Sequence, residues 1–260
     1  MNIPSGMVNA VKQRQAVLFA GAGISYNALK VGGLELRNWI GAEIAKDHPT
    51  YDFTRRSLED VCDEYEVLHD RPQLVTLVAS FIPQNMQPLR SHIAAVSTFR
   101  FIVTTNWDLL FEAAYRQIGQ RYHILMEEAD APMFDYDQHN LLKIHGSVDR
   151  PRSLICTTDD YESYPDTHPQ LLNRVGELVY NNTVLFVGHG LRDEHLRRLL
   201  SQIRRQRGEL QRRNYAVGFY DEVRRKLLGD RKIEVIEADA EDFLPSHQNA
   251  AVQPAAAADH

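Results

Sequence analysis

The stretch AVLFAGAGIS, residues 16–25, decides the fold of this chain. An apolar run typical of a buried strand leads directly into Gly21 and Gly23, which allow a tight turn before a helix. A strand, a glycine turn and a helix form the opening unit of open α/β sheets, whose ligands bind at the carboxyl ends of the strands. Free amides at the start of such a helix can face a pyrophosphate.

Further strand-like runs follow along the chain, and helical patterns separate several of them. This alternation predicts an α/β, Rossmann-like fold: a mostly parallel sheet with helices on both faces. A short helix is expected at residues 8–15, and the helical pattern of about residues 34–98 predicts an inserted helical lobe. The expected strands cover residues 16–20, 101–104, 141–144, 154–157, 183–187, 215–219 and 233–236.

The size and charge of the chain favour one large globular domain. Its 260 residues are 43% hydrophobic, enough for a full core, and we assign residues 1–245 to a single domain. Residues 246–260 are rich in Ala and Pro and are expected to form a disordered tail or linker. The net charge of -6 argues against direct nucleic-acid binding. An arginine-rich run at 197–213 is read as a solvated helix face, with a docking strip for an acidic partner as the alternative.

The N-terminus lacks the apolar core of a signal peptide, and no run is long enough to cross a membrane. Only Cys62 and Cys156 are present, too few and too far apart for a zinc pair or a disulfide framework. We therefore expect a cytoplasmic protein without a membrane anchor and without a metal site.

Three more motifs follow expected strands: TTNWD at 104–108, KIHGS at 143–147 and VGHGLRD at 187–193. Asn106 and Asp108 would protrude from a strand end, where Asn106 could orient a ribose hydroxyl or a water, although both residues could equally cap the next helix. His145 also ends a strand, and its imidazole can take a proton near neutral pH, whereas a lone histidine is more often structural. Convergence of several strand ends favours the functional interpretation.

The glycines Gly188 and Gly190 permit close approach of the backbone to a ligand, or form one more strand-to-helix turn. His189 and His195 are interpreted as ordinary loop and helix-start residues, because no spaced carboxylate or thiolate accompanies them. A dehydrogenase fingerprint would need a third glycine at the position of Tyr26, so hydride transfer is disfavoured.

Taken together, the four motifs resemble the sirtuin-like superfamily in order and spacing, from the opening strand to about Phe243. FAGAGIS is similar to the family's NAD-binding glycine turn, TTNWD to its Thr-x-Asn-x-Asp segment, KIHGS to its catalytic His-Gly segment and VGHGLRD to its ribose-side glycine loop. The resemblance implies that NAD is the substrate, that His145 is the general base and that Asn106 and Asp108 position the nicotinamide ribose or water. The NAD-binding residues implied are Gly21, Ala22, Gly23, Ser25, Thr105, Gly188 and Gly190.

Two departures from the family pattern bear on the reaction. Protein-deacylating sirtuins usually carry a four-cysteine zinc module after the His-Gly motif, whereas only Cys156 follows His145 here. The segment after the glycine turn resembles bacterial sirtuin-like domains that consume NAD in antiphage defence. The resemblance thus implies an NAD+ hydrolase without zinc that releases nicotinamide and ADP-ribose, as a homo-oligomer or under a regulatory partner subunit or domain.

Two alternatives remain open at this stage. The chain could be an NAD-dependent protein deacylase or ADP-ribosyltransferase, which would need a peptide or protein acceptor. It could also be a non-catalytic subunit that senses NAD or ADP-ribose within a larger complex.

Overall fold

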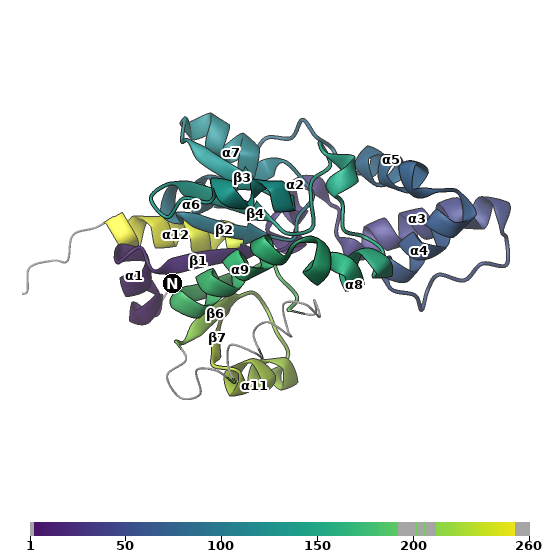
Figure 1. Ribbon diagram of the computed structural model, residues 1–260. Coiled ribbons are helices and arrows are strands. Elements are labelled where there is room, and N and C mark those ends of the chain that lie inside the picture. Colours follow the sequence, from purple (N-terminus) through teal and green to yellow (C-terminus); the bar gives the residue numbers. More distant parts are fainter. Residues whose placement is uncertain (1–2, 192–200, 202–204, 206–211, 253–260) are drawn as a thin grey trace, which may run out of the picture.

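A parallel sheet covered by helices on both faces forms the centre of the computed structural model, which describes residues 3–191, 201, 205 and 212–252 (Figure 1). The α/β, Rossmann-like fold expected from the sequence is confirmed. In the described residues the sheet has 7 strands in the order β3-β4-β2-β1-β5-β6-β7, and every pairing is parallel. The strands are β1 (Ala16–Ala20), β2 (Phe101–Thr104), β3 (Tyr122–Leu125), β4 (His139–Lys143), β5 (Thr183–Val187), β6 (Asn214–Val217) and β7 (Ile233–Ile236).

Helices occupy most of the connections between strands. Several begin with side-chain caps: Ser57 accepts from the Asp60 amide at the start of α4, and Thr157 accepts from the Asp160 amide at the start of α8. The α-helices are α1 (Ser5–Lys12), α2 (Tyr26–Leu29), α3 (Gly33–Asp47), α4 (Leu58–Leu68), α5 (Arg71–Phe81), α6 (Arg90–Thr98), α7 (Leu110–Ile118), α8 (Thr158–Thr167), α9 (Pro169–Asn181), α11 (Glu222–Asp230) and α12 (Ala240–Val252). The short 3-10 helices are η1 (Ala22–Ile24), η2 (Glu128–Met133) and η3 (Pro151–Ser153).

The strand order places a topological switch point at β1. From β1 the chain passes to β2 on one side, whereas the later strand β5 lies on the other side. The carboxyl ends of β2, β1 and β5 are in register, because Ala20 pairs with both Thr104 and Val187. Crevices at such switch points are the usual ligand sites of open α/β sheets.

The apolar residues of the central strands alternate between two cores. In β1, Leu18 and Ala20 pack in the core beneath α1, α6, α7 and α12, whereas Val17 and Phe19 pack in the core beneath α9 and α11. All five residues of β1 are buried, as expected for a strand covered on both faces. These two layers hold the strand ends, and with them the loops, in fixed relative positions.

A third apolar core lies in the helical lobe formed by α3, α4 and α5, which extends from one end of the sheet (Figure 1). Trp107, Val148 and Leu154, from loops at the strand ends, are part of this core. The fourth helix of the stretch expected as a lobe, α6, instead packs on α12 and α7 against the sheet. The lobe is therefore built directly onto the loops that carry the motifs.

Some sequence-based expectations differ from the structure. Residues 154–157 do not form a strand; they follow η3 in irregular structure, and the apolar side chains of Leu154 and Cys156 pack into the lobe instead. The sequence does not predict the edge strand β3, because its residues YHIL carry a weak apolar pattern. In the structure most of these residues are half-buried, as is usual at the edge of a sheet. α1 lies slightly before the helix expected at 8–15, and α12 continues to Val252, past residue 246. Most of the arginine-rich run, together with His195 and residues 253–260, lies outside the described residues.

The loops after β1 and β5 touch through their backbones. The Gly21 amide donates to the Val187 carbonyl at 3.0 Å, and the Gly23 amide donates to the Gly188 carbonyl at 2.9 Å. Gly188 has φ +63°, and a Cβ built on it would lie 2.2 Å from the backbone nitrogen of Ile24. Both the left-handed conformation and the close approach require glycine here.

Replacing Gly188 by alanine should therefore destabilise the fold. We expect Gly188→Ala to lower the free energy of unfolding by more than about 2 kcal/mol, because a left-handed residue with a Cβ is strained and the Ile24 backbone must move. The matched control is Gly229→Ala in α11, where a Cβ has no neighbour within 4 Å. Helix propensity predicts an unchanged stability or a gain of up to about 1 kcal/mol for the control. Urea unfolding measures both, and equal effects of the two variants would contradict the assignment.

Candidate functional site

Two adjoining cavities lie at the carboxyl ends of the central strands. The inner cavity has a volume of about 140 Å³ and extends beneath the lobe, and the outer groove has about 1020 Å³ and reaches the loop after β5. Ala22, Thr105, His145 and Tyr161 line both. Of the other residues predicted for the site, Ser25, Asn106 and Asp108 line the inner cavity, and Gly21, Gly188 and Gly190 line the outer groove. Gly23 lines neither and instead packs on the Gly188 backbone.

Asn106 is held at the inner cavity by a chain of hydrogen bonds. Its amide nitrogen Nδ2 donates to Ser25 Oγ at 3.1 Å, and its backbone amide donates to Thr104 Oγ1 at 3.0 Å. The side-chain oxygen of Asn106 is buried and has no hydrogen-bond donor among the described residues. Asn106 lines the inner cavity, and an acceptor left unsatisfied beside a cavity is a candidate partner for a donor group of a ligand.

His92, from α6, completes the chain behind Ser25. Its Nε2 lies 3.2 Å from Ser25 Oγ, and its ring packs edge-on against Phe111 with centroids 5.0 Å apart. Burial lowers the pKa of His92, which favours the neutral ring. Ser25 Oγ thus accepts from the Asn106 amide and forms a second hydrogen bond with His92 Nε2, whose direction is set by the tautomer of the ring. The chain Asn106–Ser25–His92 thus fixes the direction of the Asn106 amide.

Asp108 plays a local structural role as well as lining the inner cavity. Its Oδ1 accepts from the Leu110 amide at 3.0 Å, at the start of α7. Asp108 lies one residue before Leu109, the N-cap of α7, which has no side-chain cap, so this bond is a local turn contact that holds one carboxylate oxygen on the backbone. In the described part of the chain the Asn106 side chain makes no hydrogen bond to the start of α7.

A buried lysine, Lys143, joins the loops after β2 and β4. Its side chain is 1% exposed and forms an ion pair with Glu112 at 2.8 Å. It also donates to the Asp108 carbonyl at 2.6 Å and to Ser147 Oγ at 2.8 Å. Burial raises the pKa of Glu112, while Lys143 acts in the opposite direction. One cation therefore binds a helix, the TTNWD loop and the KIHGS loop together.

His145 lies next to Tyr161 of α8 on the wall shared by the two cavities. Its backbone carbonyl accepts from the Ile155 amide at 3.0 Å, and its Nδ1 lies 3.3 Å from the Tyr161 hydroxyl. The following residue, Gly146, has φ +80°, and a Cβ there would lie 2.1 Å from the Ser153 carbonyl oxygen. The chain thus turns back sharply after His145, and the imidazole ring stays near the carboxyl end of β4.

The loop after β5 lines the outer groove with backbone atoms more than with side chains. Although His189 lines the outer groove, its ring packs edge-on against Phe19 at 5.4 Å and its Nδ1 accepts from the Leu191 amide at 2.9 Å. These contacts agree with the structural role expected for His189. Asp193 and His195 lie outside the described residues.

Sequence reasoning missed three residues of this site. His92 sits in the helical run HIAAV, so its buried position could have been found from the spacing of its apolar neighbours. Trp107 lies inside the TTNWD motif and lines the inner cavity, but the motif alone does not show whether its ring faces a ligand or the core. Tyr161 lies in the acidic segment TDDYES, where no pattern indicates that it would face His145.

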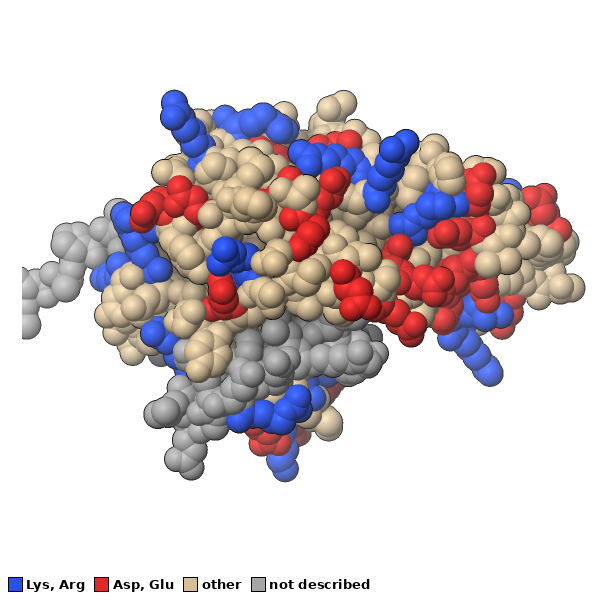
Figure 2. Space-filling model, viewed as in Figure 1, with Lys and Arg blue, Asp and Glu red and all other residues tan. Residues whose placement is uncertain are grey.

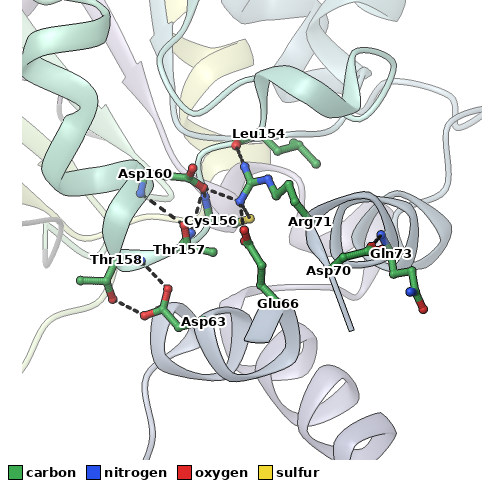
Figure 3. A network of polar contacts seen from close by, with 10 residues as sticks. All are labelled: Asp63, Glu66, Asp70, Arg71, Gln73, Leu154, Cys156, Thr157, Thr158 and Asp160. Atoms are coloured by element: carbon green, nitrogen blue, oxygen red, sulfur yellow. Dashed lines mark hydrogen bonds and ion pairs between the residues drawn. The ribbon is translucent and has the colours of Figure 1, made fainter. Parts of the chain in front are cut away.

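Arg71 of α5 connects the lobe to the segment that leads into α8 (Figure 3). It pairs with Asp160 at 2.8 Å and with Glu66 at 3.2 Å, and it donates to the Leu154 carbonyl at 2.5 Å. Asp160 also accepts from the amides of Cys156 and Thr157, and the pKa of its carboxyl is lowered even though burial alone would raise it. This network fixes the start of α8 relative to the lobe.

Cys62 and Cys156, far apart in sequence, come together in the lobe. Both are buried free cysteines of the same apolar core. A hydrogen bond with the Cys156 thiol and burial raise the pKa of Cys62. Among the described residues no group of three or more His, Cys, Asp and Glu side chains is arranged to hold a metal ion.

The face of the molecule in Figure 2 carries many acidic side chains over the region of α3, α4 and α8. The first turns of α4 and α8 contain Glu59, Asp60, Asp159 and Asp160, which suit the positive end of each helix dipole. No helix in the described part of the chain has the length and apolar character needed to cross a membrane.

A doubly wound parallel sheet with cavities at its switch point places the protein in the class of nucleotide-binding-type α/β folds. The family model described as SIR2-like domain matches residues 100–236, more than half of the chain, and the protein belongs to this family. The resemblance inferred from the four motifs is thereby confirmed.

Curated relatives cover most of the chain. The NAD(+) hydrolase ThsA of Enterococcus faecium is 28% identical over 241 residues, which are 90% of this chain and 47% of that protein. A protein of the same name from Cytobacillus dafuensis is 26% identical over 84% of this chain and 43% of its own length. Defense-associated sirtuin 2 of Bacillus subtilis is 26% identical over 45% of this chain and 12% of that protein. The chain spans about half the length of the ThsA relatives.

Solved structures support the fold. A Sir2 homologue in complex with ADP-ribose is similar with a TM-score of 0.51 over 96% of each chain, at 12% identity. A Sir2 bound to an acetylated peptide has a TM-score of 0.50 at 11% identity, over 93% of this chain and 95% of that one. At this level of identity the likeness concerns the fold alone.

Removing the buried lysine should weaken the whole site. We expect Lys143→Met to lower the free energy of unfolding by about 3–5 kcal/mol, because it leaves the Glu112 carboxylate buried without its cation. The double variant Lys143→Met/Glu112→Leu should recover much of the loss. The matched control is Lys46→Met, which breaks an ion pair with Glu43 whose lysine is 65% exposed and should change stability by less than about 1 kcal/mol. Similar losses from the two lysine variants in chemical unfolding would refute the role of Lys143.

Proposed function

We propose that this chain is an NAD+ hydrolase that releases nicotinamide and ADP-ribose, and that it acts as an NAD-depleting effector in bacterial antiphage defence. The relatives named NAD(+) hydrolase ThsA, matched over most of this chain, support the reaction and the setting. The observation that carries the proposal is that His145 and Asn106 line the same small cavity, and that the buried Asn106 oxygen has no hydrogen-bond donor among the described residues.

The sizes and linings of the two cavities match different parts of a dinucleotide. The inner cavity, at about 140 Å³, has room for a single aromatic ring, and Leu29, Leu36 and Trp107 give it apolar walls. We assign the nicotinamide to it, with its amide or the adjoining ribose near Asn106. The outer groove, with Gly21, Gly188 and Gly190 on its walls, takes the rest of NAD+, and its glycine loops let backbone approach the pyrophosphate.

In this arrangement His145 lies where the two parts of the substrate join. The bond from the ribosyl carbon to the pyridine nitrogen breaks through an oxocarbenium-like state, and its electron pair stays on the departing nicotinamide. Water attacks the ribosyl carbon, and His145 accepts the proton as general base. Asn106 and Asp108 hold the ribose or the water in line, so that orientation supplies part of the rate.

The remaining parts of the proposal concern the cellular setting. We propose a cytoplasmic enzyme that works without zinc. We further propose that it acts as a homo-oligomer or with a regulatory subunit or domain. The length of the ThsA relatives, about twice the part matched by this chain, supports control by a further domain.

Incubation of the purified chain with NAD+ tests the reaction. We expect nicotinamide and ADP-ribose to appear in equal amounts by chromatography, and His145→Ala or Asn106→Ala to lower kcat by about 100-fold or more. The matched control is His48→Ala, which alters an exposed histidine at the end of α3 and should retain activity. Thermal unfolding checks that each variant is folded.

The same assay separates the other reactions. Nicotinamide release that requires an acetyl-lysine peptide would favour deacylation, and labelled protein would indicate ADP-ribosyl transfer. Calorimetric binding of NAD+ without turnover in any assembly would favour a sensing subunit. Full activity of both His145→Ala and Asn106→Ala would refute the site.

A further inference from the structure

Arg71 of α5 binds the connecting segment, residues 154–160, which runs from η3 into the first turn of α8 (Figure 3). Its Nη2 donates to the Leu154 carbonyl at 2.5 Å, and its Nη1 pairs with Asp160 at 2.8 Å. Glu66 of α4 pairs with the same guanidinium at 3.2 Å. One side chain of the helical lobe thus holds both ends of the connecting segment.

The part of the connecting segment before α8, residues 154–157, is buried and irregular, so its backbone groups are not paired by a strand or a helix. The amides of Cys156 and Thr157 both donate to the Asp160 carboxylate, at 2.8 and 3.0 Å. Buried backbone groups need partners, and here the partners include a carboxylate and the Arg71 guanidinium that bind each other. The ion pair therefore determines the path of the chain through this part of the segment.

The connecting segment contacts the candidate site at both of its ends. The Ile155 amide, next to Leu154, donates to the His145 carbonyl at 3.0 Å. Tyr161 directly follows Asp160. His145 and Tyr161 line both cavities, and their rings pack edge-on with centroids 5.1 Å apart. A shift of the connecting segment would therefore move the wall that the two cavities share.

We infer that Arg71 is a positioning residue, through which the helical lobe sets the wall formed by His145 and Tyr161. This inference rests on the proposed function for the reaction whose rate Arg71 alters. Arg71 is not among the described residues that line the two cavities, so it acts on a substrate only through the groups that it holds. Such an indirect role affects the rate, because a displacement of about 1 Å at a reacting group can cost about 100-fold.

A second contact between the lobe and α8 is independent of Arg71. Asp63 of α4 accepts from the Thr158 amide at 2.9 Å and from the Thr158 hydroxyl at 2.5 Å (Figure 3). Thr158 is the first residue of α8. Loss of Arg71 should therefore loosen residues 154–157, next to His145, while α8 stays attached to the lobe.

The variant Arg71→Met tests the inference in the hydrolysis of NAD+. It keeps a long side chain and removes the charge and the donors. We expect kcat to fall about 10-fold while KM stays within about threefold, because the substrate contacts remain and the groups of the wall are misplaced. Arg71→Lys restores the charge without the planar fork that reaches both Leu154 and Asp160, and we expect it to recover part of kcat. Unchanged kcat in Arg71→Met, or a loss confined to KM, would overturn the inference.

Arg100→Met is the matched control, because Arg100 also binds a carboxylate and a backbone carbonyl. It pairs with Asp137 at 3.7 Å and donates to the Tyr136 carbonyl at 2.7 Å, and its side chain is 22% exposed against 29% for Arg71. Arg100 directly precedes β2, so it lies at the opposite end of the strand from the cavities. Both kinetic constants should be retained in Arg100→Met, and an equal loss of kcat in the two arginine variants would contradict a specific role of Arg71.

A double-mutant cycle checks that Arg71 acts together with Asp160. Asp160→Asn removes the negative charge and leaves a side-chain oxygen for the backbone amides. We expect it to lower kcat, and we expect the double variant Arg71→Met/Asp160→Asn to be no slower than the slower single variant, because members of one network do not act additively. Losses that multiply in the double variant would show independent roles and refute the inference.

Hydrogen exchange gives a readout that needs no substrate. The amides of Ile155, Cys156 and Thr157 bind the His145 carbonyl and the Asp160 carboxylate, so their exchange reports the position of the connecting segment. In Arg71→Met we expect peptides from this segment to exchange about 10-fold faster or more, while β1 and β5 exchange as in the wild type. Unchanged exchange in the segment, or faster exchange over the whole sheet, would refute a local positioning role.

The two proposals can fail separately. A wild-type chain that turns over no NAD+ but shows the Arg71-dependent protection of the connecting segment would refute the hydrolase and support the role of Arg71 in holding the wall. A chain that hydrolyses NAD+ with the same kcat in wild type and Arg71→Met would do the reverse.

Discussion

The site depends on one buried cation. Lys143 ends β4 with its side chain 1% exposed, and its ammonium group lies between the carboxylate of Glu112 and the carbonyl of Asp108. An unpaired charge at that depth would be costly, so the loops around it must adopt the positions that satisfy it. Because Lys143 lies two residues before His145 in sequence and binds the loop that carries Asn106, the same interaction sets the distance between the two main candidates for chemistry.

Backbone contacts and the helical lobe also hold the loops of the site in place. On one side, the turn after β1 lies so close to Gly188 that a Cβ on Gly188 would have no room. This contact places the loop after β5, which lines the outer groove, next to the switch point at β1. On the other side, Trp107 and Leu154 pack in the core of α3, α4 and α5, and Arg71 binds the start of α8. The lobe is therefore part of the wall of the inner cavity, and its stability and the shape of the cavity are linked.

Much of the candidate site could be predicted because parallel strands place their carboxyl ends at one edge. That rule brought Gly21, Asn106, His145 and Gly188 together from four separate motifs, and each lies at one of the two cavities. This rule does not predict contacts between elements of different layers. His92 reaches Ser25 from α6, and Tyr161 reaches His145 from an acidic helix, so neither contact is encoded in a local pattern. For the same reason residues 154–157 were expected as a strand, since an apolar run carries no information on whether a sheet or a lobe buries it.

By itself, the sequence determined the α/β architecture, the four loops at the strand ends and the residue types available for chemistry there, because strand and turn signals are local and depend on neighbouring residues. Only the tertiary structure decided which polar atoms lack a hydrogen-bond partner within the described part of the chain, such as the Asn106 oxygen, and which bind the backbone, such as one oxygen of Asp108. It also decided that two distant cysteines meet in the lobe and that a tyrosine faces His145. The burial of an atom and its hydrogen-bond partners depend on every element that packs around it. They are therefore determined only when the helical layers, the lobe and the sheet have packed together.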